Sequence, residues 1–252
     1  MTAESTRDRE ARIADELAID LLDDEAHAPG RDILLARRLA MLGIAGVMIS
    51  TAAIGVLHVV EPSRSLDPLS RTISEYELLS NGWIFDWGVV VLALASALIL
   101  GAMVVREMVP LRSWGSMMTL LWCIGLVGLV VFPKHPGLDP SVAGRVHWTW
   151  TLIAFFSLPI GTCLICWRHR TPTGRWPRSA IRLSMMAGGW FAVLTVQTVL
   201  SAVTPIQAWR AVGLVERALS LTEMAVMVML GLWVVHHSES PAVLDPAPDV
   251  SG

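Results

Sequence analysis

Six apolar stretches divide the chain and alternate with shorter polar segments. They are Ala40–Val60, Ile84–Val105, Trp114–Phe132, Trp148–Trp167, Ile181–Val203 and Val215–Val235. A helix of about 20 residues spans the hydrocarbon core of a bilayer. Because backbone N–H and C=O groups cannot stay unpaired in lipid, we predict a helix for each stretch rather than an open strand. The pattern therefore predicts an all-α polytopic membrane protein, a bundle of six transmembrane helices joined by short loops.

Lys and Arg are distributed unequally between the two ends of these helices. If the N-terminus lies inside, ten of them flank the inner ends and six flank the outer ends, and the densest cluster lies at residues 168–178. Positive residues are enriched on the cytoplasmic side of membranes. We therefore predict that both termini are cytoplasmic and that the loops 61–83, 133–147 and 204–214 face outward. The expected location is the cytoplasmic (inner) cell membrane of a bacterium, as a multi-pass protein.

The apolar pattern also predicts three regions along the chain. Residues 1–37 are a polar cytoplasmic tail, residues 38–237 form the membrane domain, and residues 238–252 are a Pro-containing tail that we expect to be disordered. Apolar residues recur four apart within residues 11–22, which predicts a short amphipathic helix in the first tail.

Composition agrees with a membrane protein and excludes some other classes. Apolar residues make up 54% of the chain, charged residues only 16%, and the mean hydropathy is +0.56. A net charge of −3 provides no basic excess for nucleic acid, so we expect no nucleic-acid partner. Cys123, Cys163 and Cys166 lie inside apolar segments, where we interpret them as small packing residues rather than as disulfide or redox cysteines.

The loop after the first apolar stretch is unusually polar. Between Asp67 and Tyr76 it has five hydroxyl or carboxylate side chains and the only Tyr of the chain. A plain hairpin between two membrane helices needs only a few turn residues. We therefore predict that this loop forms half of a polar site, with Ser74 and Glu75 folded back over the bundle toward His147 and Arg217.

Ionisable residues collect near the outer ends of the predicted helices. Such residues are costly in a membrane and usually face the bundle interior or a cavity. One of them, His58, ends the first apolar stretch. The candidate pocket residues are Ser74, Glu75, Asp86, Arg145, His147, Glu216, Arg217 and Glu223.

The last apolar stretch carries three polar residues on one helical face. Glu216, Ser220 and Glu223 are spaced by four and three residues, and Glu223 lies about 10 Å deeper than Glu216. An ionised carboxylate at that depth needs a partner or takes up a proton. We expect the partner of Glu223 to come from across the bundle, from His147, Arg145 or Arg71. Two interpretations follow, an interhelical clamp and a substrate or proton site.

General-base catalysis and metal binding are the two kinds of chemistry that would use these residues. His147 could serve as a general base for the hydroxyl of Ser74, although no G-x-S-x-G motif surrounds that serine. His58, His135 and His147 could converge with Asp86, but no His pair has the spacing of a metal-binding helix. We therefore expect neither a metal nor a cofactor.

The loop after the third apolar stretch has two interpretations. Pro133, Pro136 and Gly137 follow Phe132 directly and predict a rigid turn. This turn either ends the helix and does nothing more, or it forms a wall of an outward-facing pocket. In the second case Lys134 and Arg145 would hold an anionic headgroup.

Four elements together resemble a known family of prokaryotic membrane proteins, the domain-of-unknown-function 998 family. They are Asp67-Pro68 with Ile73-Ser74-Glu75-Tyr76, Phe132-Pro133, Gly144 with His147, and Gly213 with Glu216-Arg217. The resemblance covers about residues 38–237. It implies the six-helix topology and implies that Ser74, Glu75, His147 and Arg217 belong together, but no activity. The chain departs from the family at Lys134, where relatives carry an acidic residue shortly after Phe-Pro.

Three functional hypotheses remain at this point. The first is an outward-facing polar pocket that binds a lipid or other amphiphile, with membrane lipids as partners. The second is an intramembrane enzyme acting on a lipid or lipid-linked substrate, with His147 or Glu75 as base and Arg145 or Arg217 holding an anion. The third is a transporter or an accessory subunit with a membrane-protein partner.

Overall fold

The computed structural model describes the backbone of residues 3–134, 142–169, 174–203 and 211–237. Side chains within these ranges are described from residue 30 onward, except at residues 143 and 201–203. The C-terminal tail 238–252, which we predicted to be disordered, lies outside the described residues, and so does His135.

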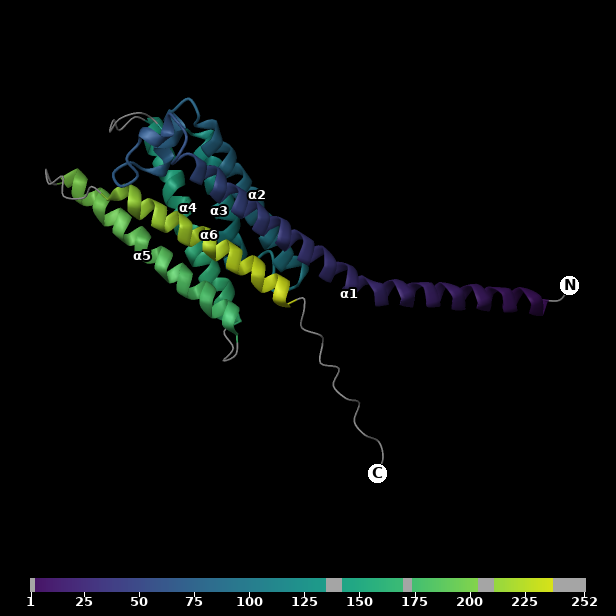
Figure 1. Ribbon diagram of the computed structural model, residues 1–252. Helices are drawn as coiled ribbons and strands as arrows, with labels where there is room; N and C mark the ends of the chain where they lie inside the picture. The colour runs from purple at the N-terminus through teal and green to yellow at the C-terminus, as the bar shows by residue number, and fades with distance from the viewer. Residues whose placement is uncertain (1–2, 135–141, 170–173, 204–210, 238–252) are drawn as a thin grey trace.

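All regular structure in the described residues is helical (Figure 1). The long helices are α1 Ala3–Val56, α2 Trp83–Val105, α3 Trp114–Val131, α4 Val142–Arg168, α5 Arg175–Val203 and α6 Val212–His237, and two short 3-10 helices, η1 Ser63–Ser65 and η2 Ile73–Leu78, lie between α1 and α2. Within these ranges six helices are long and apolar enough to cross a membrane. The prediction of a six-helix membrane bundle is confirmed.

The first helix differs most from its predicted bounds. It ends at Val56 rather than at Val60, because the chain turns at residues 57–59 before η1. It begins at Ala3, so residues 11–22 lie within one continuous helix rather than in a separate short one. Ala, Glu and Leu, which are frequent in this part of the chain, favour helix even where the sequence is polar. The N-terminal part of α1 extends away from the bundle (Figure 1).

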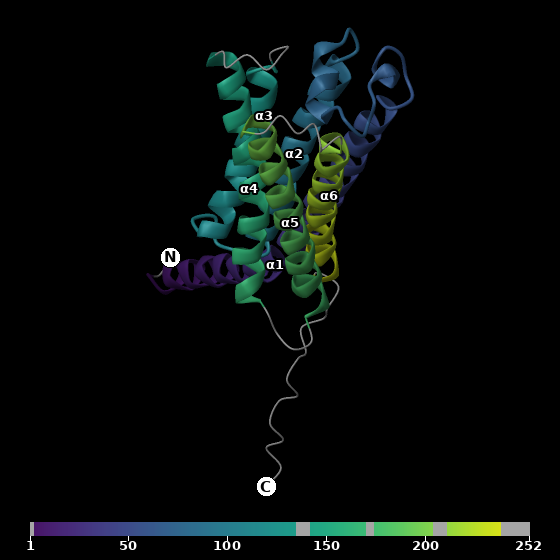
Figure 2. The same cartoon turned by 90° about the vertical axis from the view of Figure 1, so that its left-hand side faces the viewer.

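The helices pack mainly in sequential pairs. α1 packs on α2, α3 on α4 and α5 on α6, and α1 also contacts α6. α5 and α6 run side by side in both views (Figure 1, Figure 2). α6 additionally contacts α2, α4 and η2, so it touches most of the bundle. Accordingly 61% of the residues in the most apolar stretch of α6 are buried, against 17% of those in the corresponding stretch of α5.

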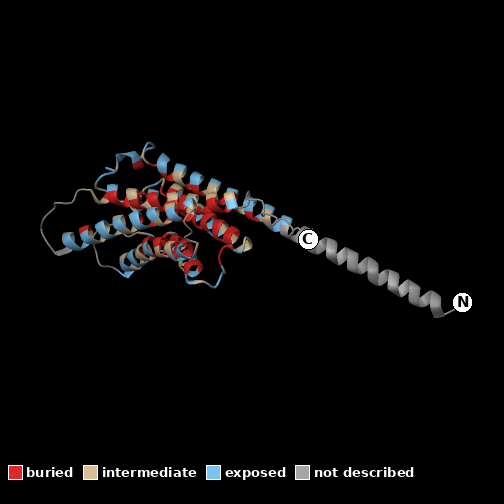
Figure 3. Cartoon of the chain, turned by 90° about the horizontal axis from the view of Figure 1, so that it is seen from below, coloured by how far each residue is buried: buried red, intermediate tan, exposed pale blue. Residues whose placement is uncertain are grey.

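The surface of the bundle suits a lipid environment. Buried positions lie on the inward sides of the helices and exposed ones on the outer sides (Figure 3). Large apolar side chains are exposed on the outer faces of the helices. They include Trp83 and Trp87 at the start of α2, and Trp114 at the start of α3 and Trp167 at the end of α4. Trp at both ends of membrane helices is typical of the two membrane interfaces. Trp122 lies deeper, is buried, and donates to Ser96 Oγ at 3.1 Å.

Close contact between α1 and α2 depends on small residues. A Cβ atom at Gly43 would lie 2.8 Å from the backbone oxygen of Ala95 and 2.5 Å from Ile99 Cγ1. A Cβ at Gly46 would lie 2.8 Å from the Cβ of Ala95. Small residues let membrane helices approach closely, and lost dispersion contacts are not replaced by a hydrophobic driving force in lipid. The glycines therefore set the distance between the two helices.

We expect Gly43→Ala to lower the thermal unfolding midpoint of the protein in detergent. Forcing an extra methyl into a tight contact costs about 1–3 kcal/mol, which exceeds the gain of about 1 kcal/mol from the better helix propensity of Ala. Gly188→Ala on α5 is the matched control, because a Cβ there would meet nothing within 4 Å. Equal stability of the two variants would contradict this role of Gly43.

Candidate functional site

The loop between α1 and α2, residues 57–82, folds back over the bundle and binds the start of α6. The backbone N–H groups of Gly213 and Leu214 donate to the carbonyl of Leu69 at 2.9 and 3.3 Å. In the opposite direction, Ile73 N–H donates to Glu216 Oε2 at 2.9 Å. The first backbone N–H groups of a helix lack partners within it, and here the loop supplies an acceptor. The loop is therefore folded back onto the helix that carries Arg217 rather than projecting from the bundle.

Arg217 holds this α1–α2 loop in place. Its Nη1 donates to the carbonyls of Pro68 and Arg71 at 2.8 and 2.7 Å, and to that of Gly213 on its own helix at 2.9 Å. Its Nη2 donates to the hydroxyl of Tyr76 at 3.0 Å. The planar guanidinium presents several donors at once, which a Lys ammonium on a flexible stem cannot reproduce in the same geometry.

Gly213 makes this approach possible. A Cβ atom there would lie 2.2 Å from the carbonyl oxygen of Arg71 and 2.6 Å from that of Pro68. Both oxygens belong to the backbone of the loop and accept from Arg217. Any side chain at this position would therefore push the loop off α6.

His58, which lies just after the end of α1, also binds Arg217. Arg217 Nε donates to His58 Nε2 at 2.8 Å, and His58 Nδ1 lies 3.1 Å from the carbonyl of Ile54. An acceptor at Nε2 and a carbonyl at Nδ1 assign the neutral tautomer with the proton on Nδ1. The His58 ring also packs edge-on against Tyr76, with ring centroids 5.4 Å apart. One guanidinium on α6 thus binds the α1–α2 loop at His58, at Pro68 and Arg71, and at Tyr76.

Lys134, just after α3, joins the same loop. Its Nζ donates to Thr72 Oγ1 at 2.6 Å and to Ser74 Oγ at 3.3 Å, and lies 3.5 Å from Glu75 Oε1. Its backbone N–H donates to Glu77 Oε2 at 2.9 Å. Burial raises the pKa of Glu77, while this N–H and the Lys134 charge act in the opposite direction. Lys134 therefore binds the α1–α2 loop, whereas Pro136 and Gly137 of the predicted turn lie outside the described residues.

Glu75 serves mainly to organise η2. Its Oε1 accepts from the N–H and the hydroxyl of Thr72 at 3.4 and 3.2 Å, and its Oε2 lies 3.2 Å from Arg71 Nη1. Thr72 and Glu75 have the Thr-x-x-Glu spacing of a capping box, in which the acidic residue reaches back to the start of the helix. This spacing is a local signal that the sequence itself contains.

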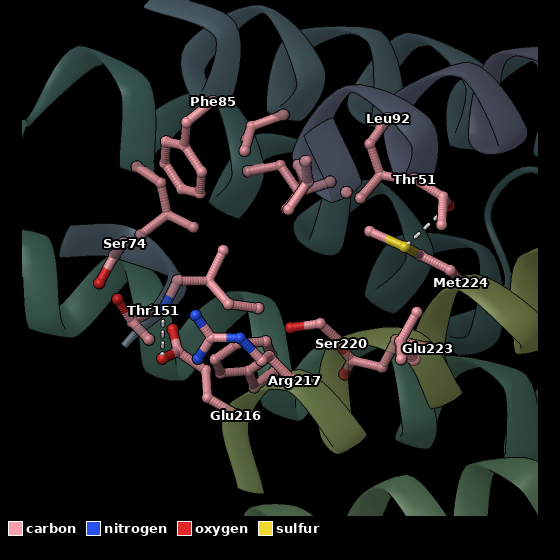
Figure 4. Close-up of a pocket in the computed structure, with 18 of the residues that line it drawn as sticks. Thr51, Ser74, Phe85, Leu92, Thr151, Glu216, Arg217, Ser220, Glu223 and Met224 are labelled. Carbon is pink, nitrogen blue, oxygen red and sulfur yellow. Dashed lines mark hydrogen bonds between the residues drawn. The ribbon is translucent and has the colours of Figure 1, made fainter. Parts of the chain in front are cut away.

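Beneath the loop lies a cavity of about 270 Å³ among α1, α2, α3, α4 and α6, with a largely apolar wall. We call it the larger cavity. Figure 4 shows Glu216, Arg217, Ser220 and Glu223 in sequence along α6, with Phe85 and Leu92 across from them. Its lining comprises Thr51, Ile54, Gly55, His58, Ile73, Ser74, Phe85, Val89, Leu92, Trp122, Leu126, Leu129, Thr151, Phe155, Glu216, Arg217, Ser220, Leu221, Glu223 and Met224.

A second cavity of about 100 Å³ adjoins the first between α4, α5, α6 and the loop. We call it the smaller cavity. Both cavities are lined by Ser74, Thr151, Phe155 and Glu216, which therefore form the wall between them. Lys134 and His147 line only the smaller one.

His147 is 5% exposed and carries one satisfied ring nitrogen. Its Nδ1 lies 2.8 Å from the carbonyl of Phe132, which assigns the proton to Nδ1. Its Nε2 is buried and has no hydrogen-bond partner among the described residues. Ser74 and His147 both line the smaller cavity, and the described contacts include no direct hydrogen bond between them.

Glu223 lies differently from what we expected. The sequence predicted a partner across the bundle in His147, Arg145 or Arg71, and this prediction is wrong. The side chain is fully buried, yet neither carboxylate oxygen has a hydrogen-bond partner in the described part of the chain. Arg71 instead pairs with Glu75, and His147 lines only the smaller cavity, so both lie toward the end of the bundle that the α1–α2 loop covers.

Besides Glu75, two candidate residues lie outside both cavities. Arg145 is exposed at the start of α4, and Asp86 is half-buried in the first turn of α2 with Oδ1 unpaired among the described residues. Neither lines the larger or the smaller cavity. The sequence placed them at the correct end of the bundle, but depth along a helix does not say which way a side chain points.

A comparison with protein-family models matches residues 44–233 of the chain to a protein of unknown function (DUF998). The chain belongs to this family. The matched DUF998 region begins within α1, ends within α6 and includes the α1–α2 loop, Lys134, His147 and Arg217. The resemblance inferred from four short motifs is therefore confirmed. No curated protein and no solved structure matches the chain.

We expect Arg217→Lys to release the α1–α2 loop of this DUF998 protein from α6. Hydrogen bonds to a charged group contribute about 1.5–3 kcal/mol each, and Lys cannot satisfy the carbonyls, Tyr76 and His58 together. Hydrogen exchange at the backbone amide of Ile73 should become faster, because that N–H is bound only while the loop is docked. Arg64→Lys, at an exposed position of the same loop, is the control. Unchanged exchange in Arg217→Lys would show that the loop is held by other contacts.

Proposed function

We propose that this integral membrane protein binds a lipid or other amphiphile in the larger cavity. The observation that carries the proposal is the composition of its wall. Phe85, Trp122, Leu126 and their neighbours provide an apolar surface, and the polar groups of the wall are those of α6, η2, His58 and a few hydroxyls. A ligand that matches this wall has an apolar body and at least one polar group. Binding sites for small molecules commonly combine an apolar wall with a few placed polar groups in this way.

The size of the cavity limits the ligand. At about 270 Å³ it lies at the lower end of the range of about 300–1,000 Å³ that is typical of small-molecule sites. It suits one short chain or a compact amphiphile rather than both chains of a phospholipid. The ligand, or the part of it that is recognised, is therefore small.

Access to the cavity is proposed between α1 and α6. Gly55 on α1 and Leu221 on α6 both line the cavity and are both exposed on the bundle surface. A Cβ atom at Gly55 would meet nothing within 4 Å, so the absence of a side chain leaves an opening there. A ligand dissolved in the outer half of the bilayer would reach the cavity without crossing the α1–α2 loop.

A second candidate function is an intramembrane enzyme acting on a lipid or lipid-linked substrate. It is favoured by His147, whose Nε2 is unpaired within the described residues and whose tautomer leaves a lone pair on that nitrogen. A general base needs such a nitrogen within reach of the substrate. The hydroxyl of Ser74 bonds to Lys134 and Thr72 instead, so within this arrangement His147 would act on a substrate or water rather than on Ser74.

Gly55→Leu should block binding without disturbing the fold. The protein in nanodiscs is irradiated with an octyl amphiphile carrying a photoreactive diazirine in its tail, and the modified residues are mapped by mass spectrometry. Labelling is expected in the cavity, near Leu126 and Met224, and should fall about tenfold in Gly55→Leu, equivalent to about 1.4 kcal/mol.

Gly188→Leu is the matched control for this experiment, because Gly188 is also open to its surroundings and lines neither cavity. Its labelling should equal that of the unaltered protein. Labelling confined to the lipid-facing sides of the helices, or equal in Gly55→Leu and the control, would refute the proposed site.

The outward orientation of the site has its own test. Ser65→Cys lies in the α1–α2 loop and Arg112→Cys between α2 and α3, and both positions are exposed. The excess of Lys and Arg on the opposite side supports an outward loop. A membrane-impermeant maleimide should label Ser65→Cys in intact cells and Arg112→Cys only after lysis. The reverse pattern would invert the topology.

A further inference from the structure

Glu223 is the one carboxylate placed against the deep part of the larger cavity. It lies on α6 two turns, or about 10 Å, below Glu216. Its side chain is fully buried, and both oxygens lack a hydrogen-bond partner among the described residues. Figure 4 shows it beside Met224 at the end of the cavity away from Ser74 and Phe85. A buried carboxylate without a partner is costly and marks a functional position inside a membrane protein.

The other charged or titratable groups that line this cavity are already engaged. Arg217 donates from Nε, Nη1 and Nη2 to His58, to loop carbonyls and to Tyr76. Glu216 accepts from the N–H of Ile73. No further Lys or Arg lines the larger cavity in the described part of the chain. The titratable group left without a partner in the described wall of the cavity is therefore acidic, and it can provide a negative charge opposite a bound cation.

The wall of this cavity suits a cation with an apolar body. Trp122 and Phe155 line the cavity, and the indole N–H of Trp122 is already used by Ser96, while Phe85 lies at the end away from Glu223. Aromatic faces attract ammonium groups, most strongly where water is excluded. A metal ion would instead require several oxygen, nitrogen or sulfur ligands. No group of three or more His, Cys, Asp or Glu that could hold one occurs among the described residues.

We propose that the larger cavity binds hydrophobic cations, amines or quaternary ammonium compounds with a compact apolar body, and that Glu223 is their counter-charge. This inference rests on the proposed amphiphile site and names the chemical class of its ligand. The ammonium group lies at Glu223, and the apolar body extends along α6 toward Ile73 and the docked loop. In this orientation one ligand occupies both the acidic end and the apolar wall.

The test compares three probes with the same octyl chain, namely octyltrimethylammonium, octanol and octanesulfonate. Each competes with the photoreactive octyl probe for full-length protein in nanodiscs of neutral phosphatidylcholine. We expect the ammonium compound to compete about tenfold more strongly than the alcohol, and the sulfonate to be the weakest. Glu223→Gln should bring the ammonium compound to the level of the alcohol, while Glu107→Gln, at an exposed site on the opposite side of the bundle, should change nothing.

The outcomes separate this inference from the proposed function. If all three probes compete equally and Gly55→Leu still blocks labelling, the amphiphile site stands and the cation preference is wrong. If no probe competes, the amphiphile site itself is wrong. If Glu223→Gln fails to fold, the probe series on the unaltered protein still decides the charge preference. Glu223→Asp, which retains the charge, should retain the preference as well.

Discussion

The guanidinium of Arg217 is the interaction on which the loop end of the bundle depends. From α6 it binds several parts of the α1–α2 loop, since it reaches His58 just after α1, the carbonyls of Pro68 and Arg71, and Tyr76. Without it, the loop carbonyls would still accept from the first N–H groups of α6, but only at Leu69. Gly213 is its steric counterpart, because any side chain there would occupy the space of the loop. The loop thereby covers the larger cavity and is more than a connection between two helices.

The docked α1–α2 loop explains why a cavity persists beneath it. Helices in lipid usually close on one another through small residues, as α1 and α2 do at Gly43 and Gly46. At the loop end of the bundle α6 instead contacts the α1–α2 loop through Arg217 and Glu216, and the larger cavity lies beneath these contacts. Small residues bring α1 and α2 together in one part of the bundle, and polar contacts of the loop cover the cavity in another. This division is the physical basis of the proposed amphiphile site.

Particular residues show how far the sequence could be interpreted. The apolar runs predicted all six helices. The position of each polar residue along its helix or loop placed Ser74, Glu216 and Arg217 at one end of the bundle, and all three line the larger cavity. It could not separate Glu216 from Glu223, although one binds the loop and the other binds nothing described. It also grouped Asp86 and Arg145 with the pocket, because the position of a residue along a helix gives its depth but not the direction in which its side chain points. Lys134 proved central through contacts with residues some sixty positions earlier, a distance that no local pattern can report.

The sequence by itself determined the membrane class, the number of helices and the family, because hydrophobic length and motif order are local properties of the chain. The tertiary structure alone decided which polar groups are satisfied. Arg217 meets its acceptors only because the loop folds back, and Glu223 stays unpaired only because no cation from another helix reaches its depth in the described residues. Pairing of buried charges depends on which helices become neighbours and how each is rotated. Those are properties of packing, and the linear order of residues does not encode them in readable form.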